Sequence, residues 1–163
     1  IVLNHTNENV KVVGIAGDSG FVSINTTKYL MNREVGFGRK LLQILEDLNI
    51  SWDHMPTGID DLSVILRSKE LTPIKEQEIL KQLIQDLQVD YAEIEHDLSI
   101  IMIVGENMKN QIGVTATATK ALSENNINIQ MISQGSSEVS IMFVVNQEQE
   151  KQAIKALYNV FFN

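Results

Sequence analysis

The chain has 163 residues, of which 44% are hydrophobic and 21% charged, and its formal net charge at pH 7 is -8. These fractions are typical of a globular protein; no run approaches the ~18 apolar residues of a membrane span, and no basic patch offsets the negative charge, so we expect neither a membrane nor a nucleic-acid partner. The absence of cysteine excludes disulfides and thiol chemistry, and with no secretory signal at the start we expect a cytoplasmic location.

The first elements in chain order are two short strands. Val10 to Ala16 is typical of a buried strand, and the cluster Gly17 to Gly20 predicts a turn after it. Phe21 to Leu30 alternates apolar and polar residues, which predicts a half-buried strand.

Helices and strands then follow in regular alternation. The apolar spacing predicts, in order, a helix from Gly36 to Asn49, a strand from Ile50 to Met55, a turn at Pro56 to Gly58, a strand from Asp61 to Arg67, a helix from Thr72 to Leu87 and a strand from Val89 to His96. Thr72 and Pro73 form a typical cap and first residue for the second helix.

The stretch from Met31 to Leu66 recurs without a gap 77 positions later, as Met108 to Phe143. Identical residues in the two copies are Met31/Met108, Gly36/Gly113, Leu45/Leu122, Asn49/Asn126, Ile50/Ile127, Gly58/Gly135 and Ser63/Ser140. Such a repeat indicates two related modules. In the second module we expect a strand from Leu98 to Val104, a helix from Gly113 to Glu124, strands from Ile127 to Ser133 and from Glu138 to Val145, and a helix from Gln147 to Val160.

The second module lacks a closing strand, and the strand at Val10 to Ala16 belongs to no other element. If that strand completes the second module, unit one (21–97) is an insertion within unit two (10–17 plus 98–163). We therefore expect an α+β fold of two ferredoxin-like β-α-β-β-α-β units, each an antiparallel sheet with its helices on one face. The run Thr115 to Thr119 has strand propensity, but the repeat places it in a helix.

The duplicated motifs resemble the ACT domain, an amino-acid-sensing module. They are Met31-Asn-x-x-x-Gly36 entering the first helix, Asn49-Ile50 leaving it, Gly105 to Met108, Asn126 to Ser133, and Ser136 to Ile141. Together they resemble the C-terminal regulatory region of aspartokinase, and Pro56 to Ser63 is similar to the lysine-responsive branch. The resemblance implies an allosteric region, a parent aspartate kinase, feedback inhibition by an amino acid, and dimerisation. ATP and Mg are then expected only in a kinase domain, since no glycine-rich phosphate loop occurs here and the fragment carries no cofactor or catalytic site.

A free amino acid needs backbone N–H donors for its carboxylate and acceptors for its ammonium group. The start of the first helix, with Gly36, Phe37 and Gly38, offers N–H groups and a positive dipole end. Asp53 follows that helix, so we expect it near Met31, where it could counter the ligand's ammonium.

The predicted site also includes residues further along the chain. Trp52 is expected to turn its side chain to the core and to face the ligand with its backbone. Asp60 and Asp61 are the local acids for the ε-ammonium of a lysine effector. Because Gln130 replaces Asp53 in unit two, we expect that unit to bind no ligand in the same way.

Four residues of unit two are candidates for an interface between chains: Ser133, Gln134, Ser136 and Ser137. The three histidines are spread singly, so no metal site is expected. Two alternatives stay open: threonine as the effector, and a ligand-free module that only holds subunits together.

Overall fold

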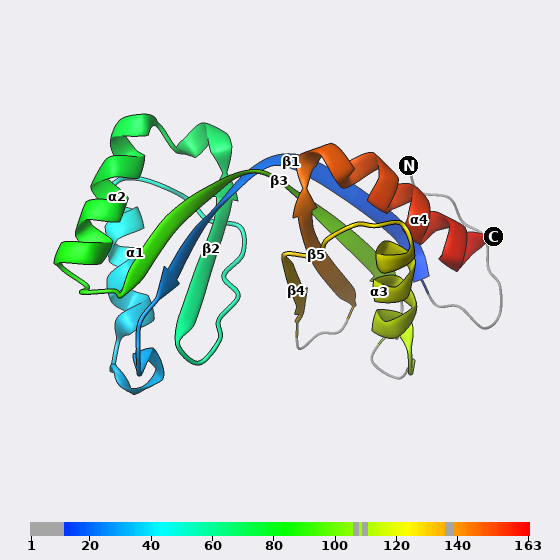
Figure 1. Ribbon diagram of the computed structural model, residues 1–163, viewed down its shortest axis with the longest axis horizontal. Helices are drawn as coiled ribbons and strands as arrows, with labels where there is room; N and C mark the ends of the chain where they lie inside the picture. Colours follow the sequence, from blue (N-terminus) through cyan, green and yellow to red (C-terminus); the bar gives the residue numbers. More distant parts are fainter. Residues whose placement is uncertain (1–11, 106–107, 109–110, 136–138) are drawn as a thin grey trace. The chain divides into compact units, whose positions relative to one another are not determined.

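The computed structural model describes residues 12–105, 108, 111–135 and 139–163 (Figure 1). The chain divides into two compact units, residues 20–96 and residues 1–19 together with 97–163. We call these the inserted unit and the outer unit. The α+β architecture of antiparallel strands with helices on one face, one unit inserted in the other, confirms the expected fold class.

Two long strands, β1 (Val12–Thr27) and β3 (Tyr91–Gly105), contribute residues to both units. The expected turn at Gly17 to Gly20 is therefore wrong, and so is a break between His96 and Leu98. Gly17 instead allows close packing, because a Cβ there would come within 2.6 Å of Ile154 Cδ1. Gly20, with φ of 82°, takes a left-handed conformation inside the strand without reversing it.

The inserted unit pairs β1 with β2 (Asp61–Arg67) in antiparallel register, from Phe21 opposite Arg67 to Thr27 opposite Asp61. Helices α1 (Phe37–Asp47) and α2 (Pro73–Gln85) cover one face of these strands (Figure 1). The core between the layers contains Val22, Ile24, Leu41, Leu45, Val64, Leu66, Ile79 and Leu83. The expected cap of α2 is confirmed, because the hydroxyl of Thr72 accepts a hydrogen bond from the N–H of Lys75 at 3.4 Å.

The segment after α1 differs from the expected strand at Ile50 to Met55. It makes only isolated bridges to β2, between His54 and Ile65 and between Thr57 and Leu62. The ladder cannot continue regularly through Pro56, because proline has no N–H to donate.

The outer unit contains α3 (Val114–Glu124), β4 (Met131–Gln134), β5 (Ser140–Asn146) and α4 (Glu150–Phe162). β5 pairs antiparallel with β3 and with β4. The run Thr115 to Thr119 is helical, as the repeat predicted. The predicted strand from Ile127 begins only at Met131, and residues 10, 11 and 138 of the other expected strands lie outside the described part.

The strands are hydrogen-bonded in the order β2-β1-β3-β5-β4. The inserted unit contains β2 and parts of β1 and β3. The outer unit contains the other parts of β1 and β3 together with β5 and β4. Two helical one-turn segments, at Ser68–Glu70 and Gln147–Gln149, precede α2 and α4, and a third at Met31–Arg33 precedes α1. Among the described residues, every helix is too short or too polar to span a bilayer.

The duplication extends beyond the stretch seen in the sequence. Both α1 and α2 recur 77 positions later as α3 and α4 with the same lengths. Left-handed residues recur at the same spacing: Gly20 with Asp97, Gly36 with Gly113, and Asn49 with Asn126.

In one part of the repeat, the residues that are equivalent in the two sheets are not those that the gapless sequence match pairs. Phe21 lies opposite Arg67, whereas Leu98, its partner 77 positions later, lies opposite Asn146, which is 79 positions after Arg67. β5 and the turn after it therefore correspond to β2 and its turn at a spacing two residues longer than that of the gapless match. A two-residue shift leaves each side chain on the same face of the sheet, which is why the apolar pattern still matched.

Candidate functional site

The expected effector residues at the start of α1 lie close together. Gly36 is the left-handed residue before the helix, with φ of 80°, and Gly38 lies in its first turn. The side chains of Met31 and Phe37 are buried in the core of the inserted unit. Met31 and Phe37 therefore offer a ligand only their backbone groups, and the first-turn N–H groups with the positive helix end suit an anion.

A charged cluster beside this helix start was missed by the sequence reasoning. Glu34 accepts from two ammonium groups, with Lys28 Nζ 2.6 Å from Oε2 and Lys40 Nζ 2.7 Å from Oε1. The hydrogen bond from Lys28, followed by that from Lys40, lowers the pKa of Glu34 below its ordinary value. Lys28 Nζ also donates to the carbonyl oxygen of Leu87 at 2.6 Å and lies 5.6 Å from the centre of the Phe37 ring. The start of α1 can thus hold a carboxylate between two lysines, and Glu34 provides one.

Asp60 and Asp61 lie at the same end of the inserted unit as Met31. The N–H of Lys28 donates to the carbonyl oxygen of Asp60 at 2.8 Å, and Asp61 lies opposite Thr27 at the end of β1. Oδ1 of Asp60 is buried without a hydrogen-bond partner among the described residues. The structure therefore brings these two acids to the turn that contains Met31.

Asp53 is not brought to Met31 within the chain. Its N–H donates to the carbonyl oxygen of Ile65 at 2.8 Å, and Ile65 lies opposite Ser23 in β1. That position is four residues, or about 13 Å, from the Thr27 end of the strand, and β2 lies in between. The Asp53 carboxylate is exposed and lies 4.0 Å from Nε of Arg67. The expectation that the strand after the helix neighbours the strand before it was wrong, because β2 takes that place.

Trp52 also differs from its expected position. Its side chain is 46% exposed and does not enter the core. It forms one wall of an open pocket of about 690 Å³ instead.

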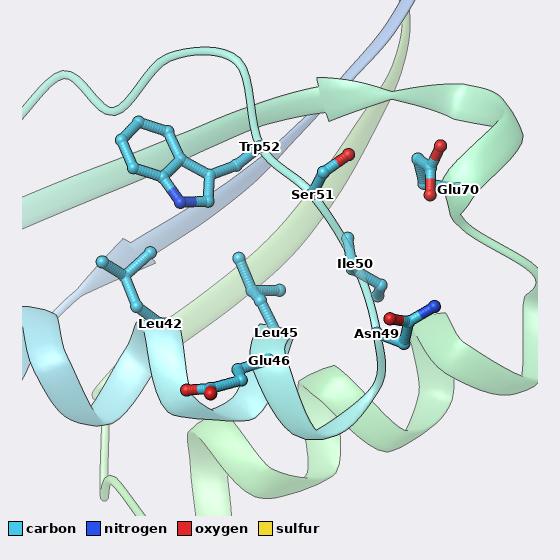
Figure 2. A pocket seen from close by; sticks show the side chains of 8 residues that line it. All are labelled: Leu42, Leu45, Glu46, Asn49, Ile50, Ser51, Trp52 and Glu70. Carbon is cyan, nitrogen blue, oxygen red and sulfur yellow. The ribbon is translucent and has the colours of Figure 1, made fainter.

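Figure 2 shows the residues that line this pocket. Its apolar surface comes from α1 and the segment that follows: Leu42, Leu45, Ile50 and Trp52. Its polar surface comes from Glu46, Asn49, Ser51 and Glu70. The lining includes two carboxylates and no basic side chain, so the pocket suits a cation better than an anion. Sequence reasoning did not find it, because Glu70 belongs to a different turn of the chain.

The expected interface residues can be placed only in part. Ser133 and Gln134 lie on β4, opposite Met142 and Ile141 of β5. Ser136 and Ser137 lie outside the described residues. Among the residues that the structure describes, no group of three histidines or acids could hold a metal ion.

The chain is similar to known proteins over nearly its whole length. Residues 101–161 match the ACT domain family. Aspartokinase 3 of Bacillus subtilis is 51% identical over 162 residues, which are 99% of this chain and 36% of that protein. The chain therefore spans little more than a third of that curated relative.

Solved structures share the fold. Aspartate kinase of Clostridium acetobutylicum, described as an allosteric enzyme, has a TM-score of 0.88 at 36% identity, covering 96% of this chain and 36% of that one. E. coli aspartokinase III in complex with lysine and aspartate has a TM-score of 0.76 at 23% identity, covering 97% of this chain and 35% of that one. The second likeness is one of fold alone.

Proposed function

Because this chain belongs to the aspartokinase regulatory regions built from tandem ACT domains, we propose that it senses an end-product amino acid and controls an attached aspartate kinase. The observation that carries this proposal is the 51% identity to an aspartokinase along 99% of the chain. ATP and Mg would be bound by the kinase domain of the parent protein, which we place in the cytoplasm.

We propose lysine as the effector, held at the start of α1. Its carboxylate would lie near the first-turn N–H groups of α1, beside Lys28 and Lys40, which already hold the carboxylate of Glu34. Asp60 and Asp61, at the same end of the unit, would receive an ammonium group. E. coli aspartokinase III, which shares this fold, is described with lysine bound, and threonine is the alternative ligand.

Asp53 can contact an effector bound at the start of α1 only across an interface between two copies of the chain. It lies about 13 Å along the sheet from the end of β1 that leads to Met31, whereas an extended lysine side chain spans about 6–7 Å. We therefore propose a homodimer in which Asp53 approaches the effector bound to the other copy.

Feedback control would then be a shift of population. A ligand that binds the inhibited arrangement more tightly than the active one favours inhibition, and the coupling is reciprocal. Kinase substrates that favour the active arrangement would weaken lysine binding by the same factor.

Calorimetric titration of the chain with lysine and with threonine tests the proposal. We expect lysine to bind and the Asp53→Ala and Asp60→Asn variants to bind it about tenfold more weakly, because each loses a hydrogen bond to a charged group. Asp47→Asn is the matched control, since Asp47 is an exposed acid at the other end of α1. Unchanged affinity in both site variants would remove these acids from the site.

A second candidate function is a ligand-free assembly module. It is favoured by two almost fully exposed apolar side chains at repeat-related positions, Val35 and Ile112, each beside the glycine that precedes a helix. Sedimentation with and without amino acids separates the two functions. The assembly module would dimerise without any of them, and no amino acid would raise its melting temperature.

A further inference from the structure

The pocket beside Trp52 is built differently from the matching region of the outer unit. Counted from β2 and β5, Glu70 and Gln149 match, because each is the last residue of the turn after its strand. Counted from α2 and α4, Gln149 matches Thr72 instead, because each of these residues directly precedes its helix. Asn49 and Asn126 are likewise equivalent, since both are left-handed residues that follow the first helix of their unit. The two units can therefore be compared group by group.

In the outer unit the side chain of Gln149 and the backbone of Asn126 form a hydrogen bond with each other. Nε2 of Gln149 donates to the carbonyl oxygen of Asn126 at 3.1 Å. A second glutamine, Gln152, donates to the carbonyl oxygen of Asn125 at 2.9 Å. The end of α3 is thus closed by side-chain amides of the same chain.

In the inserted unit the same place holds two acceptors. Glu70 replaces the glutamine, and a carboxylate has no N–H to give to the carbonyl oxygen of Asn49. Both residues line the pocket, and Figure 2 shows them on the same side of it. Among the described residues no donor reaches the Asn49 carbonyl oxygen or the Glu70 carboxylate. The ammonium of Lys75 donates to the backbone carbonyl oxygen of Glu70, at 3.3 Å, and forms no ion pair with its carboxylate.

The rest of the pocket suits an organic cation with an apolar part. The carboxylate of Glu46 adds a second negative charge, and the last turn of α1 contains no basic residue to offset the negative helix end. The half-exposed Trp52 ring lies over Leu42 and Leu45 in Figure 2, and together they form an apolar wall. The volume of about 690 Å³ is in the range of small-molecule sites.

We propose that this pocket is a second ligand site that binds a small organic ammonium ion without a carboxylate. Its ammonium group lies between the Glu70 carboxylate and the Asn49 carbonyl oxygen, where it supplies the donors that Gln149 supplies in the outer unit. Its apolar part lies against Trp52 and Leu45. A free carboxylate on the ligand is disfavoured by Glu46 and Glu70. This site lies at the end of α1, away from the helix start proposed for lysine, and does not depend on that proposal.

Trp52 is the only tryptophan of the chain, so its fluorescence reports directly on the pocket. We would titrate the 163-residue chain with n-hexylammonium, n-hexanol and n-hexanoate, which share an apolar body and differ in charge. Hexylammonium is expected to change the Trp52 emission with a saturable curve that weakens as salt is added, with hexanol binding about tenfold more weakly and hexanoate not at all. Equal binding of hexylammonium and hexanol, or no response to hexylammonium, would overturn the proposal.

The matched variant is Glu70→Gln, which copies the outer unit and lets an amide donate to Asn49. It should weaken hexylammonium binding about tenfold or more while the chain stays folded, since the charged acceptor is lost and its replacement closes the site. Glu124→Gln removes an exposed acid of α3 and should leave binding unchanged. Undiminished binding by Glu70→Gln would contradict the role of this carboxylate. If hexylammonium fails while lysine binds, only the second site is refuted.

Discussion

Gly36 and Gly38 lie two residues apart, yet replacing each by alanine should change stability in opposite directions. Gly36 has φ of 80° and ψ of 12°, and the nearest atom to a Cβ placed there is Nε of Arg39 at 4.0 Å. Gly36→Ala therefore meets no clash and costs only the left-handed backbone, about 1–2 kcal/mol. Gly38 lies within the first turn of α1 with open space around its Cβ position, so Gly38→Ala should stabilise by about 0.5 kcal/mol.

Equilibrium urea unfolding followed by far-UV circular dichroism measures both changes as shifts of the midpoint at constant slope. In a chain of this length, 1 kcal/mol corresponds to about 2–4 °C in melting temperature. Gly113→Ala makes the same test in the outer unit, because Gly113 has φ of 92° and nothing within 4 Å of its Cβ position. It should match Gly36→Ala. If Gly36→Ala and Gly38→Ala change stability with the same sign, the backbone argument fails.

Three further predictions concern the cap, the core and a histidine. Thr72→Ala removes the hydroxyl that caps α2 and should cost about 0.5–1 kcal/mol in urea unfolding, with an unchanged result arguing against the cap. Leu122→Ala, in the core of the outer unit, should cost about 2–5 kcal/mol, visible as a large fall in the unfolding midpoint. Burial lowers the pKa of His54 below 6.5, so below that pH the unfolded chain binds a proton that the folded chain does not. Stability should therefore fall as pH falls through 6.5, and His54→Leu should flatten that slope in melting curves between pH 7.5 and 5.5.

The helices could be predicted from sequence because their signals are local. The apolar spacing, the Thr72-Pro73 start and the glycines before α1 and α3 each depend on a few neighbouring residues. The repeat added what propensity alone would have missed, as at Thr115 to Thr119, which form a helix despite their strand-like composition.

The strands were harder to predict from the sequence, because where a strand begins and ends depends on partners that are distant along the chain. Glycine is common in turns, but here Gly17 leaves room for the side chain of Ile154. Gly20 takes a left-handed conformation within a strand that continues on both sides of it. The two-residue displacement of β5 was invisible, since a shift by the strand period preserves the apolar pattern.

The site shows the same limit. The motif placed Gly36 and Phe37 at the start of a helix, which the structure confirms, and their role in effector binding stays a prediction. The pairing of Lys28 and Lys40 with Glu34 spans a turn whose geometry the sequence does not contain. Trp52 was expected in the core by strand alternation, and the irregular segment around Pro56 removes the alternation on which that expectation rested.

The course of β1 and β3 has a consequence for how such proteins can change. These strands are hydrogen-bonded neighbours, and the chain enters and leaves residues 20–96 along them. Entry and exit on adjacent strands allow the inserted unit to be exchanged for another with no new crossing of the chain. Such an exchange leaves the core of the outer unit intact, because that core is built from residues outside the inserted segment.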